Sequence, residues 1–166
     1  CIPAVSANQM RAVDRLAVEV FDLEILQMME NAGRNLAQNA WEMLNGERGS
    51  VTVLAGSGGN GGGGLCCARH VHNRGFPVQV ILDREGEALG GAARHQLQIL
   101  QAAGLEPLDP ARAEMAIRSS ALVVDALIGY GLHDAPRGRA AALIDLCNAH
   151  ADRILSLDVP SGLDAT

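Results

Sequence analysis

The chain has 166 residues, a formal net charge of −6 and 48% hydrophobic residues, only a few of them aromatic. This length predicts a single domain with an aliphatic core, and the acidic balance argues against a broad basic surface for nucleic acid. All thirteen basic residues are arginine, which excludes a Walker-type lysine, a Schiff-base lysine and a lysine general base from this chain. No apolar run approaches the ~20 residues of a membrane span, so no membrane partner is expected.

Two helices are predicted ahead of the first strand. Residues 6–20 form the first, because Ser6 and Gln9 have the spacing of a capping box. Residues 23–44 form the second, which carries an apolar stripe at helical spacing.

Strand-like and helical segments alternate after these two helices. The strand-like runs are Val51–Ala55, Val78–Leu82, 121–127 and 154–159, and the helical segments between them are 65–74, 91–103, 111–119 and 138–151. Such alternation favours parallel pairing with right-handed crossovers. Because the runs are almost continuous in Val, Ile and Leu, both faces of the sheet should be covered. The sequence therefore predicts a three-layer αβα Rossmann-like α/β domain with a mostly parallel sheet and two extra N-terminal helices.

Seven of the nine residues 56–64 are glycine, and they lie between the first predicted strand and the next helix. We expect a loop here, because glycine allows positive φ and a close approach of backbone to a ligand. A helix that starts after such a loop directs free N–H groups and its positive dipole end at one point. That arrangement suits a phosphate or another anion, so the segment predicts a nucleotide-like ligand.

Two acids, Asp125 and Asp158, end hydrophobic runs and should share the carboxyl edge of the sheet with the glycine segment. Each could simply cap the loop that follows it. Taken together, however, Asn60, Asp125 and Ser161 are hard oxygen donors, which suit an alkali or alkaline-earth ion better than zinc. With one carboxylate in the set, a monovalent ion is favoured, and Asp158 is left to act on a substrate.

The four cysteines, Cys1, Cys66, Cys67 and Cys147, form no CxxC pair and have no zinc-finger spacing to histidine. We interpret Cys66 and Cys67 as small residues that pack a helix against the sheet. Unpaired thiols of this kind are typical of a reducing compartment, so a cytoplasmic location is expected.

Five segments in order carry a resemblance to a known family. They are residues 6–14, 27–33, the segment around Asn60, 124–131 and 157–164. The chain resembles, over essentially its whole length, the YjeF N-terminal domain family, the NAD(P)H-hydrate epimerases. This resemblance implies a Rossmann-like isomerase of cofactor repair, which interconverts the R and S epimers of NAD(P)HX, a hydrated nicotinamide cofactor. Residues 1–166 are then expected to form one such domain, incomplete at its C-terminal end.

The resemblance also implies the residues of the site. A potassium ion would be bound by Asn60, Asp125 and Ser161. The NAD(P)HX site would be lined by Gly59, Asn60, Gly61, Gly62, Gly63, Gly129, Tyr130, Gly131, Leu132, His133, Asp134, Ala135 and Asp158. Our hypothesis for the chemistry makes Asp158 the catalytic acid and base, which protonates the leaving hydroxyl and then accepts a proton from water.

Two partners are expected beside the small-molecule substrate NAD(P)HX. One is a second copy of the chain, in a homodimer formed through the two N-terminal helices. The other is an ADP/ATP-dependent NAD(P)HX dehydratase, either separate or fused to this domain.

The glycine segment departs from the pattern of the family, which reads Asn-Asn-Gly-Gly-Asp-Gly. Here Gly59 and Gly63 stand in place of the first Asn and the Asp. Losing two polar contacts favours an alternative, a catalytically weakened relative that binds a nucleotide-like ligand or a protein partner without turnover. An ordinary NAD-dependent dehydrogenase fits less well, because the dinucleotide fingerprint is poor and the chain leaves no room for a substrate domain.

Overall fold

The computed structural model describes residues 5–132 and 134–164. Its helices are α1 (Ala7–Glu19), α2 (Ile25–Leu44), α3 (Gly59–Asn73), α4 (Gly91–Ala102), α5 (Ala113–Ser119) and α6 (Gly138–His150), with short 3-10 turns η1 (Gly86–Ala88) and η2 (Pro110–Arg112). Its strands are β1 (Val51–Ala55), β2 (Val78–Leu82), β3 (Leu122–Ala126) and β4 (Ile154–Ser156). Within the described ranges, no helix is both long and apolar enough to cross a membrane.

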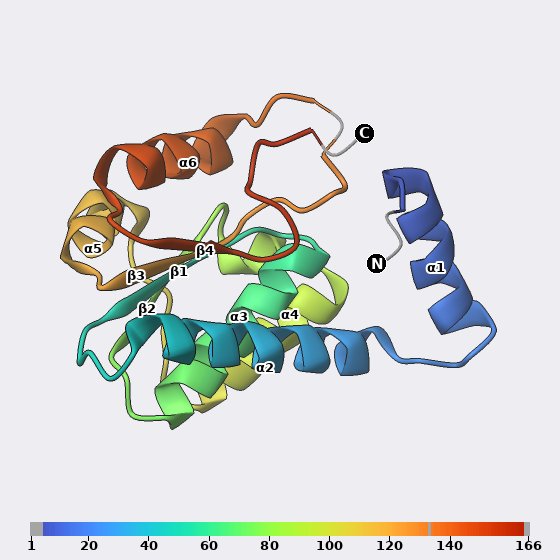
Figure 1. Ribbon diagram of the computed structural model, residues 1–166, viewed down its shortest axis with the longest axis horizontal. Helices are drawn as coiled ribbons and strands as arrows, with labels where there is room; N and C mark the ends of the chain where they lie inside the picture. The colour runs from blue at the N-terminus through green and yellow to red at the C-terminus, as the bar shows by residue number, and fades with distance from the viewer. Residues whose placement is uncertain (1–4, 133, 165–166) are drawn as a thin grey trace.

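The four strands form one parallel sheet in the order β2-β1-β3-β4. In the central strand, Val53 pairs with Val80 on one side and with Val124 on the other. Helices α2, α3 and α4 cover one face of the sheet, while α5 and α6 cover the opposite face (Figure 1). The predicted three-layer architecture is therefore confirmed, and its parallel strands all end at the same edge.

The fourth predicted strand, 154–159, is wrong at its C-terminal end, because β4 stops at Ser156. Two residues later Asp158 has a φ of 70°, a left-handed value that no β-strand accommodates. The chain therefore turns away from the sheet at this point, and the turn carries Asp158 and Ser161 back over the strand ends.

The predicted loop over the glycine segment is also wrong. Helix α3 already begins at Gly59, so Asn60 and the four glycines after it lie in its first turns, and none of them has a positive φ. Glycine is needed here for packing. A Cβ on Gly61 would lie 1.6 Å from the carbonyl oxygen of Gly56, and one on Gly64 would lie 2.5 Å from the Cβ of Ala126. Bare backbone thus lets α3 begin directly against the ends of β1 and β3.

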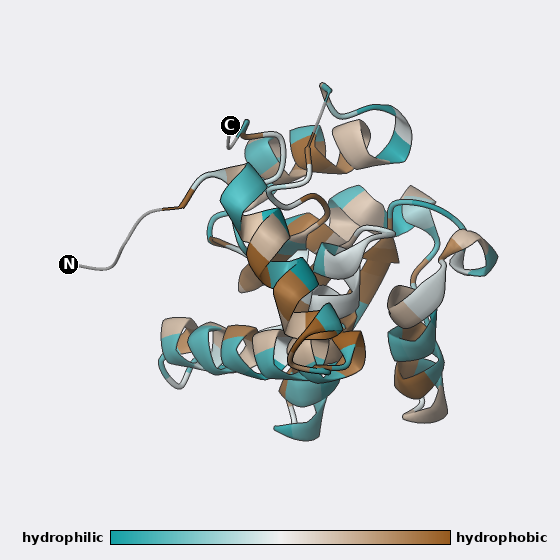
Figure 2. Ribbon diagram, turned by 90° about the vertical axis from the view of Figure 1, so that its right-hand side faces the viewer, coloured by the Kyte–Doolittle hydropathy of each residue, from teal (hydrophilic) through white to brown (hydrophobic). Residues whose placement is uncertain are grey.

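Helix α1 differs from the other helices in standing apart from the three layers (Figure 1). Its predicted capping box is confirmed, because the Gln9 N–H donates to the Ser6 hydroxyl and the Ser6 N–H donates to the Gln9 side chain. Of its residues only Ala7 is buried. Hydrophobic residues in brown lie along α1 in Figure 2, and Val13 and Leu16 are each 49% exposed.

Candidate functional site

A cleft of about 1080 Å³ lies between α1 and the carboxyl edge of the sheet. Its lining includes residues from four separate parts of the chain, among them Asp14, Asn60, Gly129, Tyr130 and Asp158. Open parallel sheets bind their ligands at this edge, and the volume is that of a site for a nucleotide-sized molecule. The sequence-based prediction that the strand-end segments share one edge is confirmed.

The first turn of α3 opens into this cleft. Its N-cap is Gly58, which has no side chain to accept hydrogen bonds from the first N–H groups of the helix. A Cβ on either Gly58 or Gly59 would meet nothing within 4 Å, so both glycines border open space. Free amides and the positive end of the helix dipole are therefore available to an anionic group in the cleft.

Asp125 lies at the end of β3, below the cleft, and is only 7% exposed. One of its carboxylate oxygens accepts the Ser161 hydroxyl at 2.5 Å, and the other accepts the Ser161 N–H at 2.8 Å and the Ser156 hydroxyl at 3.2 Å. All of these donors are neutral, and within residues 5–132 and 134–164 no salt bridge reaches Asp125. A buried carboxylate without a countercharge, set among oxygen atoms, fits a small cation.

Asp158 lies on the cleft side of the same turn and is exposed. Its Oδ2 accepts the backbone N–H of Tyr130 at 2.7 Å. The Asn60 amide donates to the carbonyl of Leu157 at 3.1 Å. A Cβ on Gly129 would lie 2.6 Å from Asp158 Oδ2 and 2.9 Å from Asn60 Oδ1. Three segments far apart in sequence therefore meet at Gly129, and they bring the Asp158 carboxylate beside the start of α3.

Two functional candidates on α1, Asp14 and Arg11, were not predicted from the sequence. The Tyr130 hydroxyl donates a short hydrogen bond to Asp14 Oδ2, and the Arg11 guanidinium lies 5.9 Å from the centre of the Tyr130 ring. The bond to Asp14, with a smaller contribution from burial, raises the pKa of Tyr130 to about 12. The one signal for Asp14 in the sequence is its place at the end of the 6–14 segment on which the resemblance rests.

Most of the residues predicted for NAD(P)HX line the cleft, namely Gly59, Asn60, Gly63, Gly129, Tyr130, Gly131, Asp134, Ala135 and Asp158. Gly61 and Gly62 lie behind it, against the Gly56 carbonyl and the Met29 side chain, and Leu132 is not part of the lining. The ion-binding candidates Asp125 and Ser161 lie beneath the lining. His133 is outside the described residues.

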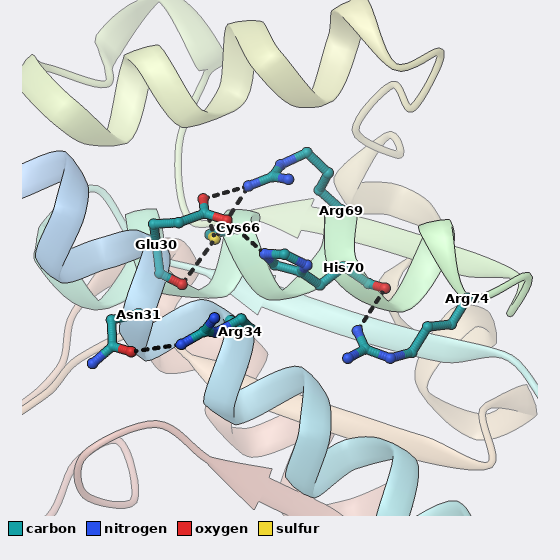
Figure 3. A network of polar contacts seen from close by, with 7 residues as sticks. All are labelled: Glu30, Asn31, Arg34, Cys66, Arg69, His70 and Arg74. Carbon is teal, nitrogen blue, oxygen red and sulfur yellow. Dashed lines mark hydrogen bonds and ion pairs between the residues drawn. The ribbon is translucent and has the colours of Figure 1, made fainter.

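A second polar cluster joins α2 to α3 away from the cleft (Figure 3). Glu30, Cys66 and His70 each offer one atom that could bind a metal, and these atoms lie within 4.8 Å of one another. The Glu30 carboxylate, however, already receives Arg69 at 2.5 Å and His70 at 2.7 Å. Burial, together with the bond to Glu30, raises the pKa of the Cys66 thiol to about 12. With a guanidinium as its countercharge and a protonated thiol, the cluster is a polar contact between two helices.

The sequence profile of a family described as YjeF-related protein N-terminus matches residues 25–166. An NAD(P)H-hydrate epimerase of Dehalogenimonas lykanthroporepellens is 49% identical over 99% of this chain. A bifunctional NAD(P)H-hydrate repair enzyme, Nnr, of Moorella thermoacetica is 36% identical over 97% of it. The crystal structure of yeast ynu0 is similar over 98% of this chain and 72% of its own, with a TM-score of 0.81 and 26% identity.

The relatives are longer than this chain. It spans 66% of the Dehalogenimonas protein and 32% of the Moorella protein. Helix α1 precedes the segment that the family profile matches, although the match to the Dehalogenimonas protein includes nearly the whole chain.

Proposed function

This chain belongs to the YjeF-related protein N-terminus family, and on that premise we propose that it is an NAD(P)H-hydrate epimerase. The similarity to a relative of that name supports the proposal. The observation that carries it is the meeting of Asp158 with Asn60 beside the open first turn of α3. The helix start suits the phosphates of a dinucleotide, and the neighbouring carboxylate suits acid–base chemistry on the same ligand.

The reaction we propose is the loss and return of one water molecule. The hydrate carries a hydroxyl on the ring carbon next to nitrogen. When this hydroxyl is protonated and leaves as water, the nitrogen lone pair stabilises a planar cation. Water that adds to the opposite face then gives the other epimer.

Asp158 is our candidate for both proton transfers in this reaction. As an acid it protonates the departing hydroxyl, and as a carboxylate it accepts the proton of the returning water. Its exposure to the cleft supports this role. The Tyr130 N–H binds Oδ2, and among residues 5–132 and 134–164 no hydrogen bond to Oδ1 is found, so this oxygen can serve the substrate.

Potassium is our proposal for the ion of this site. Asp125, Ser161 and Asn60 would hold it, and the uncompensated charge of the buried Asp125 supports a cation there. Oxygen donors with a single carboxylate suit a monovalent ion of low charge density. A cation here would neutralise Asp125 and stabilise the segment of Ser161, whose hydroxyl accepts the Ile128 N–H at 2.9 Å.

The remaining assignments concern partners and location. We propose a homodimer through the two N-terminal helices, α1 and α2, and the apolar residues Val20 and Phe21 between them, which are 65% and 74% exposed, support it. We propose an ADP/ATP-dependent NAD(P)HX dehydratase as the functional partner, since the Nnr relative is bifunctional and about three times as long as the matched region. The free, buried thiols of Cys66, Cys67 and Cys147 support a cytoplasmic location.

A coupled assay tests the proposed activity. The R epimer of NADHX or NADPHX is mixed with an S-specific dehydratase, and its consumption is followed with and without this protein. We expect a clear acceleration over spontaneous epimerisation. No acceleration would contradict the epimerase and favour the second candidate, a domain that binds a nucleotide-like ligand without turnover. The glycines at positions 59 and 63 are the observation in favour of that candidate.

A further inference from the structure

We propose that Asp14 of α1 is a positioning residue for this site, acting through the Tyr130 side chain on the carboxylate of Asp158. This inference rests on the proposed epimerase function. It concerns a helix that lies outside the segment matched by the family profile.

Helix α1 is attached to the rest of the domain through side chains that meet Tyr130. Its apolar side chains are largely exposed, so hydrophobic packing contributes little to its attachment. Two side-chain interactions cross from α1 to the strand-end segments, the Asp14–Tyr130 hydrogen bond and the Arg11–Tyr130 cation–π contact. Both end on the same residue, and we call this pair of contacts the Tyr130 clasp.

Tyr130 contacts the Asp158 carboxylate as well as helix α1. Its backbone N–H donates to Asp158 Oδ2 at 2.7 Å, while its neighbour Gly129 lies in close contact with Asp158 and Asn60. The position of the 129–131 segment therefore sets the direction of the Asp158 carboxylate. A general acid must lie within hydrogen-bonding distance of the group that it protonates, so a small shift of this segment would reduce the rate.

The Tyr130 clasp is suited to hold the 129–131 segment in place. A hydrogen bond to a carboxylate is stronger than one between neutral groups. Asp14 accepts from a phenol that is protonated near neutral pH, and the same bond raises the pKa of Tyr130 to about 12. The clasp thus connects α1 to the catalytic segment without contact between Asp14 and Asp158.

The kinetic test compares Asp14→Ala, Tyr130→Phe and the double variant. Each single variant removes the Asp14–Tyr130 bond and leaves the Tyr130 N–H in place. We expect kcat to fall about tenfold in each, the order of effect of one charge-assisted hydrogen bond, with KM little changed. Because the two residues act through one bond, the double variant should be no slower than either single one. Asp14→Asn, which still accepts a hydrogen bond, should recover part of kcat.

Glu19→Gln is the matched control, since it removes a negative charge from the same helix at an exposed position. It should behave as the unmodified protein. Losses of kcat that add fully in the double variant would contradict the positioning role, and so would a rise in KM with unchanged kcat. Either result would make Asp14 a group that binds the ligand directly.

A spectroscopic test separates this proposal from the proposed function. The chain contains a single tyrosine, so a titration followed by tyrosinate absorbance reports on Tyr130 alone. In Asp14→Ala its pKa should fall from about 12 toward the ordinary value of about 10. An unchanged titration would overturn the clasp, whatever the kinetics. A shifted titration with unchanged kcat would overturn the positioning role alone. If the unmodified protein is inactive but Tyr130 titrates with a pKa of about 12, the proposed epimerase function is overturned, while the clasp stands.

Discussion

The two acids at the carboxyl edge of the sheet have opposite surroundings. Asp125 is 7% exposed and accepts several hydrogen bonds from neutral donors. Asp158 is exposed, has a left-handed backbone and accepts one N–H from a segment that is itself held by α1. Two acids at the same edge of the sheet are thus held by different contacts. The difference suits the buried Asp125 to an ion and the exposed Asp158 to a substrate.

The largest expected effect is that of Asp158→Asn. If Asp158 moves protons, the epimerase rate should fall by ~10²- to 10⁴-fold. The melting temperature should hardly change, because the side chain is exposed and an amide oxygen can still accept the Tyr130 N–H. The coupled assay and a thermal melt measure the two quantities. Asp152→Asn, at an exposed acid outside the cleft lining, is the control, and equal activity of the two variants would remove Asp158 from the chemistry.

Asp125→Asn tests the buried acid of the pair through its effect on the free energy of folding. The substituted amide replaces one carboxylate oxygen by an N–H donor, which would face either the Ser161 N–H or the Leu127 N–H, at a cost of about 1–3 kcal/mol of folding free energy. Potassium should raise the melting temperature of the unmodified protein, since an ion that binds only the native state stabilises it. That response should be lost in Asp125→Asn.

The control for the ion is choline chloride at the same ionic strength. Asp158→Asn should keep the potassium response, which would separate the two acids in one experiment. A response that survives in Asp125→Asn would contradict an ion site at this residue.

Gly129→Ala sharpens the comparison, because the added methyl group would press on Asp158 while no polar group is removed. The new Cβ would lie 2.6 Å from Asp158 Oδ2 and 2.9 Å from Asn60 Oδ1, so both side chains must move. We expect kcat/KM to fall about tenfold, as small misplacements of reacting groups commonly do. Gly90→Ala is the matched control, since nothing lies within 4 Å of its Cβ, neither glycine has a positive φ, and Gly90 is outside the cleft lining. Equal effects of the two would show that the crowding at Gly129 is irrelevant.

The smallest effect is expected where the chain departs from the family pattern. Gly59→Asn adds a polar side chain in open space, and one new hydrogen bond of about 0.5–1.5 kcal/mol should lower KM severalfold. Gly63→Asp is the contrasting change, because its Cβ would lie 2.7 Å from Leu157 Cδ2 and the leucine must move aside. If Gly59→Asn leaves KM unchanged, position 59 makes no contact with the substrate.

Much of the fold was predictable because its signals are local. The capping box of Ser6 and Gln9 and the strands Val51–Ala55 and Val78–Leu82 depend on residues close together in sequence. The parallel direction of the strands then follows from alternation, and it places Asn60, Asp125 and Ser161 at one edge. Their roles in binding an ion remain predictions.

The start of α3 shows the limit of such reasoning. A run of glycines favours a loop on local propensity, yet Gly61 and Gly64 are helical because the helix must lie against Gly56 and Ala126. Ala126 is distant along the chain and Gly56 is positioned by the sheet, so no local sequence pattern could predict that these glycines are helical.

The sequence by itself determined the layers, the parallel sheet and the edge at which the polar residues gather, since periodicity and alternation are properties of neighbouring residues. Only the tertiary structure decided that Asp125 is enclosed by neutral donors while Asp158 is exposed to the cleft. It also decided that Asp14 meets Tyr130, although the two residues lie more than a hundred positions apart in the sequence. A hydrogen bond between segments so far apart depends on how the helices pack around the sheet, and that is set by the whole chain.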